Sequence, residues 1–597
     1  MHRFVKFVVL ASTLCACTDI PPEHKLTSNV KDWRDEVIYQ LIVDRFADGD
    51  LNNNQSVDPS GLARYQGGDW QGVIDHLDYL KKLGVTALWI SPVIRNVDTD
   101  SNVDGYHGYW AQDFTLTNPH MGDLAKLREM VDKAHAQGFK VVLDIVANHM
   151  GQLFYYDING NDNPDTNIIG NGSSTTVTFT NEYDPDYDPA GIQALTSLGL
   201  SGPADIKWLY IPAIHRMPPM PVEFQNKDWY NRKGRIIDYT KRDQVLTGDF
   251  PGGLKDLKTL LPEVQTALAK VYTDWIDSAD FDAFRIDTLK HVEYPFWNSF
   301  CPAVREHCKS AGKSNFFMFG EVFDGDDQLV STYTNDEQVD SVVFFPQKFS
   351  VIDRVIKFGQ SGTDAIETQF KTLQSLYSSV PKTDGPTDET GAPLNTQQLM
   401  VNFLDNHDIP RFLYDKNSLP ALQQALAFIF FESGIPCVYY GTEQELTGGN
   451  DPANRERLWD SGYSTTTSTF GFIQSLSKIR KLYRPLRHGG LNTVWSTPRM
   501  TGEDAGIYAF ERTDPADGKT VLVVMNVNET QTSSTSYQGS AMKVSFPPGT
   551  GLVSVFPDTS VGVPVDGSGK VVVKVPSRGV IVLVAQGDAG GISPLNN

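Results

Sequence analysis

The sequence has few cysteines, no long apolar run and a deficit of positive charge. No apolar stretch in its 597 residues approaches the roughly 20 residues that a membrane-spanning helix needs. Its 51 Lys and Arg residues face 73 Asp and Glu residues, so the formal net charge is −22. A surface this acidic repels phosphate backbones and anionic lipids, which argues against nucleic-acid binding and electrostatic membrane binding. With 40% hydrophobic residues, the composition instead indicates a globular protein of about two to four domains.

The N-terminus has the pattern of an export signal. MHRFVK carries two fixed positive charges, and the apolar stretch FVVLASTLCA that follows is too short to span a membrane. Leu14 and Ala16 precede Cys17 as in a bacterial lipoprotein box, in which the cysteine is lipidated. We predict a signal peptide over residues 1–16 and a polar tether over 17–35. The protein is then exported, either as a cell-surface or periplasmic lipoprotein anchored at Cys17 or as a plain secreted protein.

Beyond this region the only cysteines are Cys301, Cys308 and Cys437. A large exported protein needs no disulfide framework. Cys301 and Cys308 are seven residues apart, and in a helix this spacing spans about 10 Å, which exceeds the reach of a disulfide. We therefore expect no structural disulfide and no redox or zinc role.

The middle of the chain alternates apolar, β-rich segments with helical patterns. Near-continuous apolar strands between helices are typical of a parallel sheet covered by helices. Eight such strands predict an α/β fold, a (β/α)8 TIM barrel whose active site lies at the C-terminal ends of the strands. The predicted strands are residues 37–46, 87–93, 140–149, 283–291, 316–322, 341–347, 399–408 and 436–444. Helical patterns lie around 73–80 and 124–131 and over 263–279, 366–380 and 421–434.

Two irregularities divide the chain further. About a hundred residues rich in Asn, Asp, Gly and Pro follow the third strand, which is too long for a loop and predicts an inserted subdomain over 150–256. From residue 489 the helical period gives way to alternating segments such as TVLVVMNV and KVVVKV, which indicate an antiparallel β-sandwich over 489–597. The barrel then comprises residues 36–149 and 257–488.

Three acidic residues end predicted barrel strands: Asp287, Glu321 and Asp408. Hydrolysis of an acetal needs a proton donor and an anionic partner for the oxocarbenium-like transition state. Arg285 lies two residues before Asp287, hence on the same face of the strand, where it would keep Asp287 ionised as a nucleophile. Glu321 follows the apolar FFMFG, where desolvation would raise its pKa for general-acid work. One such acid alone is more often a salt-bridge or capping residue, but three together with Arg285 favour a glycosidase site.

Several short segments resemble the α-amylase family of glycoside hydrolases. DIVANH (144–149), FRIDTLKH (284–291), GEV (320–322) and FLDNHD (403–408) are similar, in order, to the four short conserved regions of that family. Further similar segments are DGYHGYWAQDF, GLKDL and GGNDPANRERLW, the first and last especially as in fungal-type α-amylases. The resemblance covers about residues 37 to 488 and implies a catalytic barrel, an inserted domain B and a C-terminal domain C.

The resemblance also implies roles for individual residues. Asp287 is the nucleophile that forms a covalent glycosyl-enzyme, Glu321 the general acid/base, and Asp408 the residue that stabilises the distorted sugar, while Arg285 orients Asp287. The implied contacts of the sugar being cleaved are His149, His407, His107 and, as a stacking platform, Tyr109. The other implied substrate residues are Asp144 as a support, Asp451 and Arg455 on the glycone side, and Lys290 and His291 toward the leaving group.

The resemblance further implies calcium, whose preferred ligands are carboxylate and carbonyl oxygens. One ion bridges domain B and the barrel through Asn148, Asp256 and the carbonyl of His291. The acidic run 181–189 is a candidate for the missing domain B ligand, or only a solvated loop. A second site, similar to that of bacterial cyclodextrin glucanotransferases, is implied in the 48–69 loop, although an Asx-rich loop is often only a turn. Its ligands are Asp48, Asp50, Asn53, Asn54, the carbonyl of Gly67, and Asp69.

These observations predict a monomeric, retaining α-amylase that hydrolyses α-1,4 bonds of starch and maltooligosaccharides. Relatives that cut α-1,6 bonds tend to carry Val at the position of Thr288, which favours α-1,4 specificity. Glucanotransferases usually carry a bulky aromatic residue where Gly252 stands and have two additional C-terminal domains, so water is favoured over sugar as the acceptor. One alternative is an α-glucan transglycosylase. The other is a catalytically inactive glucan-binding protein, and the presence of Asp287, Glu321 and Asp408 argues against that one.

Overall fold

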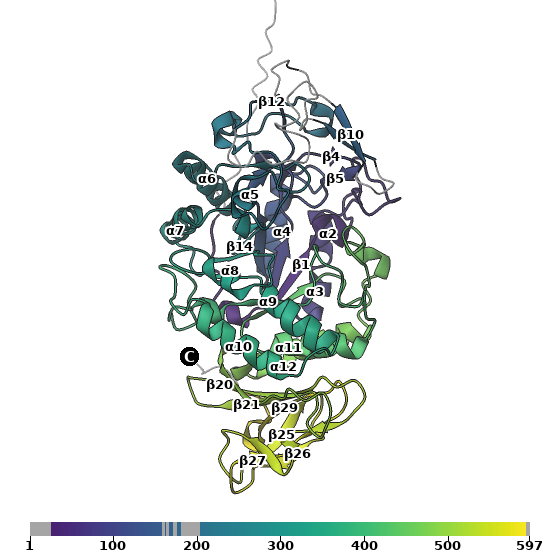
Figure 1. Cartoon of the computed structure of the whole chain (residues 1–597), viewed down its shortest axis with the longest axis vertical. Helices are drawn as coiled ribbons and strands as arrows, with labels where there is room; N and C mark the ends of the chain where they lie inside the picture. Colours follow the sequence, from purple (N-terminus) through teal and green to yellow (C-terminus); the bar gives the residue numbers. More distant parts are fainter. Residues whose placement is uncertain (1–24, 158–161, 163–165, 171–175, 181–202, 593–597) are drawn as a thin grey trace, which may run out of the picture.

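The computed structural model describes residues 25–157, 162, 166–170, 176–180 and 203–592. The predicted signal peptide, Cys17 and the acidic run 181–189 lie outside the described residues. The barrel lies between the strands β10 (Thr166–Gly170) and β12 (Ile206–Trp208) at one end of the molecule and the C-terminal strands at the other (Figure 1). Within the described residues no helix has both the length and the apolar character to cross a bilayer.

The eight predicted strands form one parallel sheet that closes into a barrel. Its order is β16-β15-β14-β7-β2-β1-β18-β17, and every neighbouring pair is parallel. A parallel bridge between Val343 and Val401 joins the two ends of the sheet. The predicted TIM barrel is therefore confirmed. The strands are β1 (Ile38–Leu41), β2 (Ala87–Ile90), β7 (Lys140–Ile145), β14 (Ala283–Ile286), β15 (Phe317–Gly320), β16 (Ser341–Val342), β17 (Val401–Phe403) and β18 (Ile435–Tyr439).

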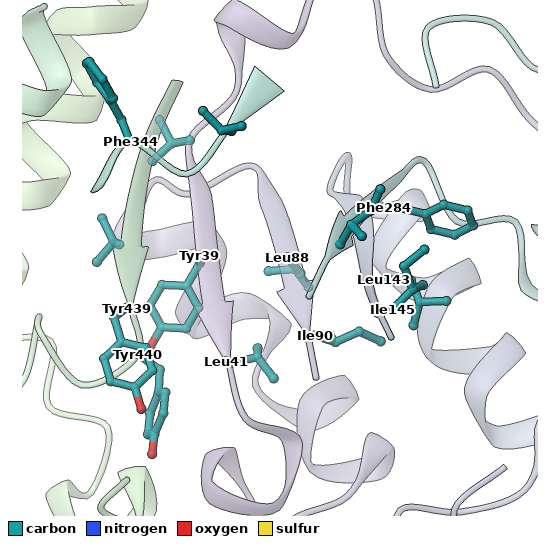
Figure 2. Packing of buried hydrophobic residues seen from close by; sticks show 14 of the residues in the cluster. Tyr39, Leu41, Leu88, Ile90, Leu143, Ile145, Phe284, Phe344, Tyr439 and Tyr440 are labelled. Atoms are coloured by element: carbon teal, nitrogen blue, oxygen red, sulfur yellow. The ribbon is translucent and has the colours of Figure 1, made fainter. Parts of the chain in front are cut away.

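Alternate residues of these strands belong to two separate cores. Tyr39, Leu88 and Leu143 pack outward against the surrounding helices, as the close view in Figure 2 shows for this set. Their neighbours Ile38 and Trp89 point into the barrel, where side chains from the other strands join them. Because side chains alternate along a strand, every second residue past a strand end continues toward the barrel axis. This alternation aims the residues of the C-terminal ends at one point.

Helices cover the outside of the barrel. In α4 (Leu124–Ala136) the buried residues Leu127, Met130, Val131 and Ala134 recur at helical spacing and face the strands. A helix over Lys348–Lys357 has π-type hydrogen bonding. The other helices of the barrel wall are α2 (Trp70–Asp75), α3 (Leu77–Leu83), α6 (Pro262–Ala279), α7 (Tyr294–Ser310), α8 (Asp327–Thr332), α10 (Asp364–Leu376), α11 (Leu419–Phe431), α12 (Ser468–Leu482) and α13 (Pro485–His488).

The insertion after β7 leaves and rejoins the barrel through one antiparallel pair. β8 (His149–Met150) pairs with β13 (Lys255–Asp256), so that His149 lies opposite Asp256. Within the insertion, β9 (Phe154–Tyr156) pairs with β12, and β10 pairs with β11 (Thr176–Thr180). A short helix, α5 (Arg242–Thr247), precedes the return. This pairing places the two ends of the insertion beside the barrel mouth.

The C-terminal part consists of antiparallel sheets around their own core. Six strands have the order β19-β20-β21-β29-β25-β26, and three more, β23-β24-β27, form a second sheet. Leu522 and Val524 of the first sheet and Met542 of the second share one buried cluster. The strands are β19 (Gly490–Trp495), β20 (Ile507–Thr513), β21 (Thr520–Asn526), β23 (Ser536–Tyr537), β24 (Ser540–Lys543), β25 (Gly551–Phe556), β26 (Gly562–Pro564), β27 (Lys570–Val571) and β29 (Val580–Ala585).

Cys301, Cys308 and Cys437 are buried free thiols, as expected. Cys301 and Cys308 both lie in α7. Burial raises the pKa of the Cys301 and Cys308 thiols to about 12, which keeps both groups protonated and unreactive.

Candidate active site

The three predicted acids line one cleft at the C-terminal ends of the strands. Asp287 and Glu321 directly follow β14 and β15, and their amides donate to the carbonyls of Ile145 (2.9 Å) and Ile286 (2.8 Å). Asp408 lies in the loop after β17. All three line a cleft of about 800 Å³. Residues more than a hundred positions apart are therefore brought together as their strand positions predicted.

One guanidinium joins the acids at the floor of the cleft. Arg285 is fully buried, and its Nη1 donates to Asp287 Oδ1 (2.8 Å) and Asp144 Oδ1 (2.9 Å). Its Nη2 lies 3.0 Å from Glu321 Oε2. Asp144 also accepts from Trp89 Nε1 at 2.9 Å. The guanidinium thus fixes the positions of two cleft carboxyl groups relative to each other.

The carboxyl groups of the cleft have raised pKa values. Burial raises the pKa of Asp287 well above its usual range; Arg285 opposes this rise, while the charges of Glu321, Asp144 and Asp408 add to it. Arg285 lies where predicted and lowers the pKa of Asp287, as expected, but burial and three acidic neighbours outweigh this one cation, so the pKa of Asp287 stays raised. Burial also raises the pKa of Glu321, as expected, and Asp408 contributes to that rise.

His407 and Arg455 flank Asp408. His407 Nε2 lies 3.1 Å from Asp408 Oδ2, and Arg455 Nη2 lies 3.4 Å from Asp408 Oδ1. Arg455 also contacts Asp451 Oδ1 at 3.1 Å. His407 is held from behind by Gln40, whose Nε2 lies 2.7 Å from its Nδ1. Four predicted site residues therefore line the cleft together: His407, Asp408, Asp451 and Arg455.

Flat rings line one wall of the cleft. The ring of Tyr109 lies parallel to that of His407, with centroids 5.3 Å apart, and His107 lies parallel to Tyr109 at 5.6 Å. Tyr109 donates its hydroxyl to Asp144 Oδ2 at 2.8 Å. Burial lowers the pKa of His149 to about 4 and that of His107 and His407 well below the usual range. These imidazoles are neutral near pH 7 and can exchange hydrogen bonds with sugar hydroxyls.

Lys290 and His291 lie beside Glu321 along the same cleft. Lys290 Nζ donates to the carbonyl of Phe323 at 2.5 Å and lies 3.4 Å from Asp324 Oδ2. His291 Nδ1 lies 3.1 Å from the carbonyl of Val245 in the insertion. Both predicted residues therefore sit where the barrel meets the insertion.

The cleft also contains aromatic residues that sequence reasoning missed. Phe250 stacks parallel to His149 at 5.3 Å and meets His291 edge-on at 4.9 Å. Phe323 and Tyr239 line the same cleft and are half exposed. Gly252 lacks a side chain, as noted, but Phe250 two residues earlier supplies an aromatic ring. The sequence prediction considered only the residue four positions before Asp256, which is Gly252. Phe250 was missed because Gly252 and Gly253, with φ of 95° and 74°, turn the chain between it and Asp256.

Two of the residues predicted to bridge calcium, Asn148 and Asp256, lie on the strand pair that joins the insertion to the barrel. Asp256 pairs in register with His149, and the carbonyl of Asn148 accepts from the amide of Leu257 at 2.9 Å. Asp256 is buried, and its Oδ2 accepts from Asn231 Nδ2 (2.7 Å), while its Oδ1 has no hydrogen-bond partner among the residues that the structure describes. Burial raises the pKa of Asp256 well above its usual range, and Glu293 and Asp249 add to the rise. A buried carboxylate oxygen without a donor fits a cation.

The 48–69 loop fits a cation as well. Asp48 Oδ1, Asn53 Oδ1 and Asn54 Oδ1 are all buried without a hydrogen-bond partner. Gly67 has φ of 99°, and a Cβ there would lie 2.6 Å from Asn54 Oδ1, so only glycine admits this approach. The oxygens of Asp69 accept from the amides of Gly49, Asp50 and Gly72. Asp50 itself caps Asn52 at 3.0 Å, which ties its Oδ1 to the loop backbone.

One further acidic group, Asp32, Glu389 and His488, meets within metal-ligand distances among the described residues. Arg34 binds Asp32 at 2.6 Å, and Arg484 binds Glu389 at 2.5 Å. These arginines already neutralise the carboxylates. We therefore assign the group to ion pairing.

Comparisons with known proteins identify the family. The profile described as alpha amylase, catalytic domain, matches residues 40–467. An α-amylase of Streptomyces lividans is 30% identical over 567 residues, covering 89% of this chain and 57% of its own length, so the chain spans little more than half of that relative. A cyclomaltodextrin glucanotransferase of Thermoanaerobacterium thermosulfurigenes is 28% identical, covering 88% of this chain and 63% of its own.

Among solved structures, an Anoxybacillus α-amylase is similar with a TM-score of 0.69 and 26% identity, covering 95% of this chain and all of its own. A cyclomaltodextrin glucanotransferase described as having a three-domain ABC distribution shares the fold at 24% identity and a TM-score of 0.69. Because that transferase is described as having three domains, a three-domain arrangement alone does not separate hydrolases from transferases. The profile match over most of the chain shows that this protein belongs to the α-amylase family of glycoside hydrolases.

Proposed function

We propose that the protein is a retaining α-amylase that hydrolyses α-1,4-glucosidic bonds of starch and maltooligosaccharides. One observation carries the proposal: Asp287 and Glu321 meet on the same guanidinium, at 2.8 and 3.0 Å, in a cleft lined by neutral histidines and Tyr109. A shared guanidinium supports the shorter carboxyl separation of about 5 Å that belongs to retaining rather than inverting enzymes.

The chemistry follows from the two carboxyl groups. Burial raises the pKa of Glu321, which favours its protonated form, and Glu321 donates this proton to the glycosidic oxygen as the bond to the leaving sugar breaks. The carboxylate of Asp287 attacks the anomeric carbon and forms the glycosyl-enzyme. Glu321 then removes a proton from water, which displaces Asp287 and yields the α-anomer. Substrate binding must leave the proton on Glu321, because Asp287 is reactive only when ionised.

Other residues bind and orient the sugar. We assign Asp408 to the stabilisation of the distorted ring, with His407 and Arg455 holding its two oxygens. Tyr109 supplies a stacking face, and His107 and His149 hydrogen-bond the hydroxyls. Asp451 and Arg455 bound the glycone side, and Lys290 and His291 lie toward the leaving group.

We further propose two calcium sites. Asn148, Asp256 and the carbonyl of His291 would hold the ion that ties the insertion to the barrel, and the unpartnered oxygens of Asp48, Asn53 and Asn54 support the second. A bound ion supplies positive charge to carboxylates that otherwise lack a partner. Its contribution is to stabilise the cleft walls.

The proposal is tested by the products formed from soluble starch. We expect linear maltooligosaccharides, released as α-anomers in a proton NMR time course. β-anomeric products would contradict retention. Absence of any product from a chromogenic maltooligosaccharide would instead favour an inactive glucan-binding protein.

A second candidate is an α-glucan transglycosylase. The ring of Phe250 in the cleft favours it, because an aromatic face near the leaving group binds an incoming sugar in preference to water. Cyclic or elongated glucans among the starch products would identify this activity.

We also propose that the chain is monomeric and exported, either as a bacterial cell-surface or periplasmic lipoprotein anchored at Cys17 or as a secreted protein. Mass spectrometry of the mature N-terminus distinguishes a lipidated Cys17 from a free one. The substitution Cys17→Ser should move the protein from the membrane fraction to the soluble fraction, and light scattering should give the mass of one chain.

A further inference from the structure

A second cavity lies at the opposite end of the barrel from the active-site cleft. It has a volume of about 630 Å³, within the range of about 300–1,000 Å³ that is usual for small-ligand sites. Val37 and Thr86, which immediately precede β1 and β2, and Lys140, which begins β7, line its floor. The last turns of α3 and α12 form its sides. We call it the basal cavity.

The basal cavity concentrates positive charge in an acidic protein. Among the described residues, two acids line it, Asp35 and Glu36. Arg487 binds Asp35, and Lys140 Nζ lies 3.8 Å from Glu36 Oε1. Of the cations at the rim, Lys81, Lys478 and Lys481 contact no carboxylate in the part of the chain that the structure describes. The seven cationic lining residues are Lys81, Lys82, Lys140, Lys478, Arg480, Lys481 and Arg487.

Arg480 is the second observation that indicates a ligand. Its side chain is 1% exposed and lines the cavity, yet no carboxylate among the described residues pairs with it. It donates only to backbone carbonyls, including those of Phe430 (2.7 Å) and Gly434 (2.8 Å), and its Nε has no partner. Ser477 Oγ, also on the lining, is likewise buried without a partner. A buried charge without a counter-ion is costly, and a bound anion would relieve that cost.

Helix dipoles explain part of this charge. Lys81, Lys82 and Lys481 lie in the last turns of α3 and α12, where cations are favourable in any protein. Arg480 in α12 and Arg487 in α13 also lie in last turns. The dipole effect does not account for Lys140 at the start of a strand, for Lys478, or for the buried Arg480 Nε and Ser477 Oγ that have no partner among the described residues.

The lining argues against a second glucan site. Its only aromatic residue is Phe139, which is 2% exposed and offers no ring face to a sugar. The donors, by contrast, are ammonium and guanidinium groups, which match the oxygens of a phosphate group.

We propose that the basal cavity binds a phosphate-bearing anion, either free in solution or as the headgroup of a lipid. The site is independent of the glucan cleft and of the proposed hydrolysis. It also qualifies the conclusion drawn from net charge, because the cavity is locally cationic within a chain of net charge −22.

The test is calorimetric titration of the full chain with inorganic phosphate, at an ionic strength held constant with chloride. We expect saturable binding to one site and about tenfold weaker binding by the double variant Lys478→Gln/Lys481→Gln. The matched control Lys270→Gln/Lys371→Gln removes the same charge from exposed ion pairs on α6 and α10 and should bind like the wild type. Arg480 is left intact, since its four hydrogen bonds to carbonyls support the fold.

A second arm distinguishes the two sources of phosphate. The lipid-free variant Cys17→Ser is mixed with phosphatidylglycerol vesicles and with phosphatidylcholine vesicles. If the protein binds phosphatidylglycerol vesicles but not phosphatidylcholine vesicles, and the lysine double variant loses this binding, the ligand is a lipid headgroup. If the protein binds inorganic phosphate but neither kind of vesicle, the ligand is a free anion. Absence of both, or equal weakening in the control variant, overturns the proposal.

Discussion

The active-site cleft and the basal cavity, at opposite ends of the barrel, differ in their balance of charge. At the C-terminal ends of the strands, Asp144, Asp287 and Glu321 share one guanidinium, that of Arg285. At the N-terminal ends, seven cations face two acids around the basal cavity. The barrel therefore separates a cleft rich in acids from a cavity rich in cations.

This difference has a physical origin and a consequence. In a βα barrel every helix ends at the N-terminal face of the sheet, where its C-terminal dipole favours cations, and begins at the opposite face, where anions are favoured. In the cleft, burial raises the pKa values of the acids more than Arg285 lowers them, and general-acid catalysis needs such a raised pKa on Glu321. Net charge averages over both ends and conceals this separation.

The largest expected effect comes from removing the proton donor of the acidic end. Glu321→Gln keeps the shape of the side chain but cannot donate a proton at neutral pH, so we expect starch hydrolysis to fall by about 10²–10⁴-fold. The matched change Glu306→Gln on the exposed surface of α7 should leave the rate unchanged. Initial rates on a chromogenic maltooligosaccharide measure both, and a Glu321→Gln enzyme with most of the wild-type rate would refute the assignment.

The substitution Asp408→Asn tests the electrostatic interaction between Asp408 and Glu321. Asp408 raises the pKa of Glu321, so neutralising it should lower that pKa, and the alkaline limb of the residual activity should move to lower pH by about one unit. Activity itself should fall by about 100-fold. Asp451→Asn removes a rim charge and should leave the limb in place. An unmoved limb in Asp408→Asn would show that Glu321 does not govern it.

Much of this acidic end could be predicted from the sequence. The eight strands are short apolar runs between helices, and Asp287 and Glu321 follow them directly, so strand position alone placed these acids in one cleft. The contact of Gln40 with His407, 367 residues away, could not be predicted, because it forms only when β1 and β18 pair and close the barrel. Phe250 could not be placed either, because two glycines with positive φ shift the chain between it and Asp256.

The basal end shows a different limit of sequence reasoning. Lys81, Lys140 and Lys478 are unremarkable in their local segments, and their cavity exists only where three elements meet. The unpaired state of Arg480 depends on which acids fold nearby, which composition does not specify.

Removal of calcium tests whether a bound cation stabilises the junction between the insertion and the barrel. Chelation by EDTA should lower the melting temperature by about 5 °C or more, because Asp256 loses the partner of its buried Oδ1. Asp256→Asn should have a lower melting temperature that responds less to EDTA. Asp48→Ala removes a ligand of the other loop only and should keep the response of the bridging site. A melting temperature and activity unchanged by EDTA would exclude the proposed calcium dependence.

Substitution of Phe250 tests how the glycosyl-enzyme divides between transfer to a second sugar and hydrolysis by water. We expect Phe250→Ala to lower the ratio of transfer to hydrolysis several-fold, about 3- to 10-fold, since a stacking face contributes about 1 kcal/mol to sugar binding. Phe250→Tyr should preserve the ratio, and Phe358→Ala, a partly exposed ring outside the cleft, should not change it. Chromatography of products from maltotriose measures the ratio. An unchanged ratio in Phe250→Ala would remove the observation that favours transglycosylation.

The smallest expected effect concerns the coupling of the two ends. Lys478→Gln/Lys481→Gln changes the charge of the basal cavity by two units, but these lysines lie across the barrel from Asp287 and Glu321, beyond a Debye length of about 10 Å at 0.1 M salt. We therefore expect kcat/KM on maltooligosaccharides to stay within about twofold of the wild type, with or without phosphate. A larger change confined to phosphate-containing buffer would show that the ends communicate. The packed side chains of Trp89, Val142 and Phe319 in the barrel interior would then be the physical connection to examine, since they fill the space between the two sites.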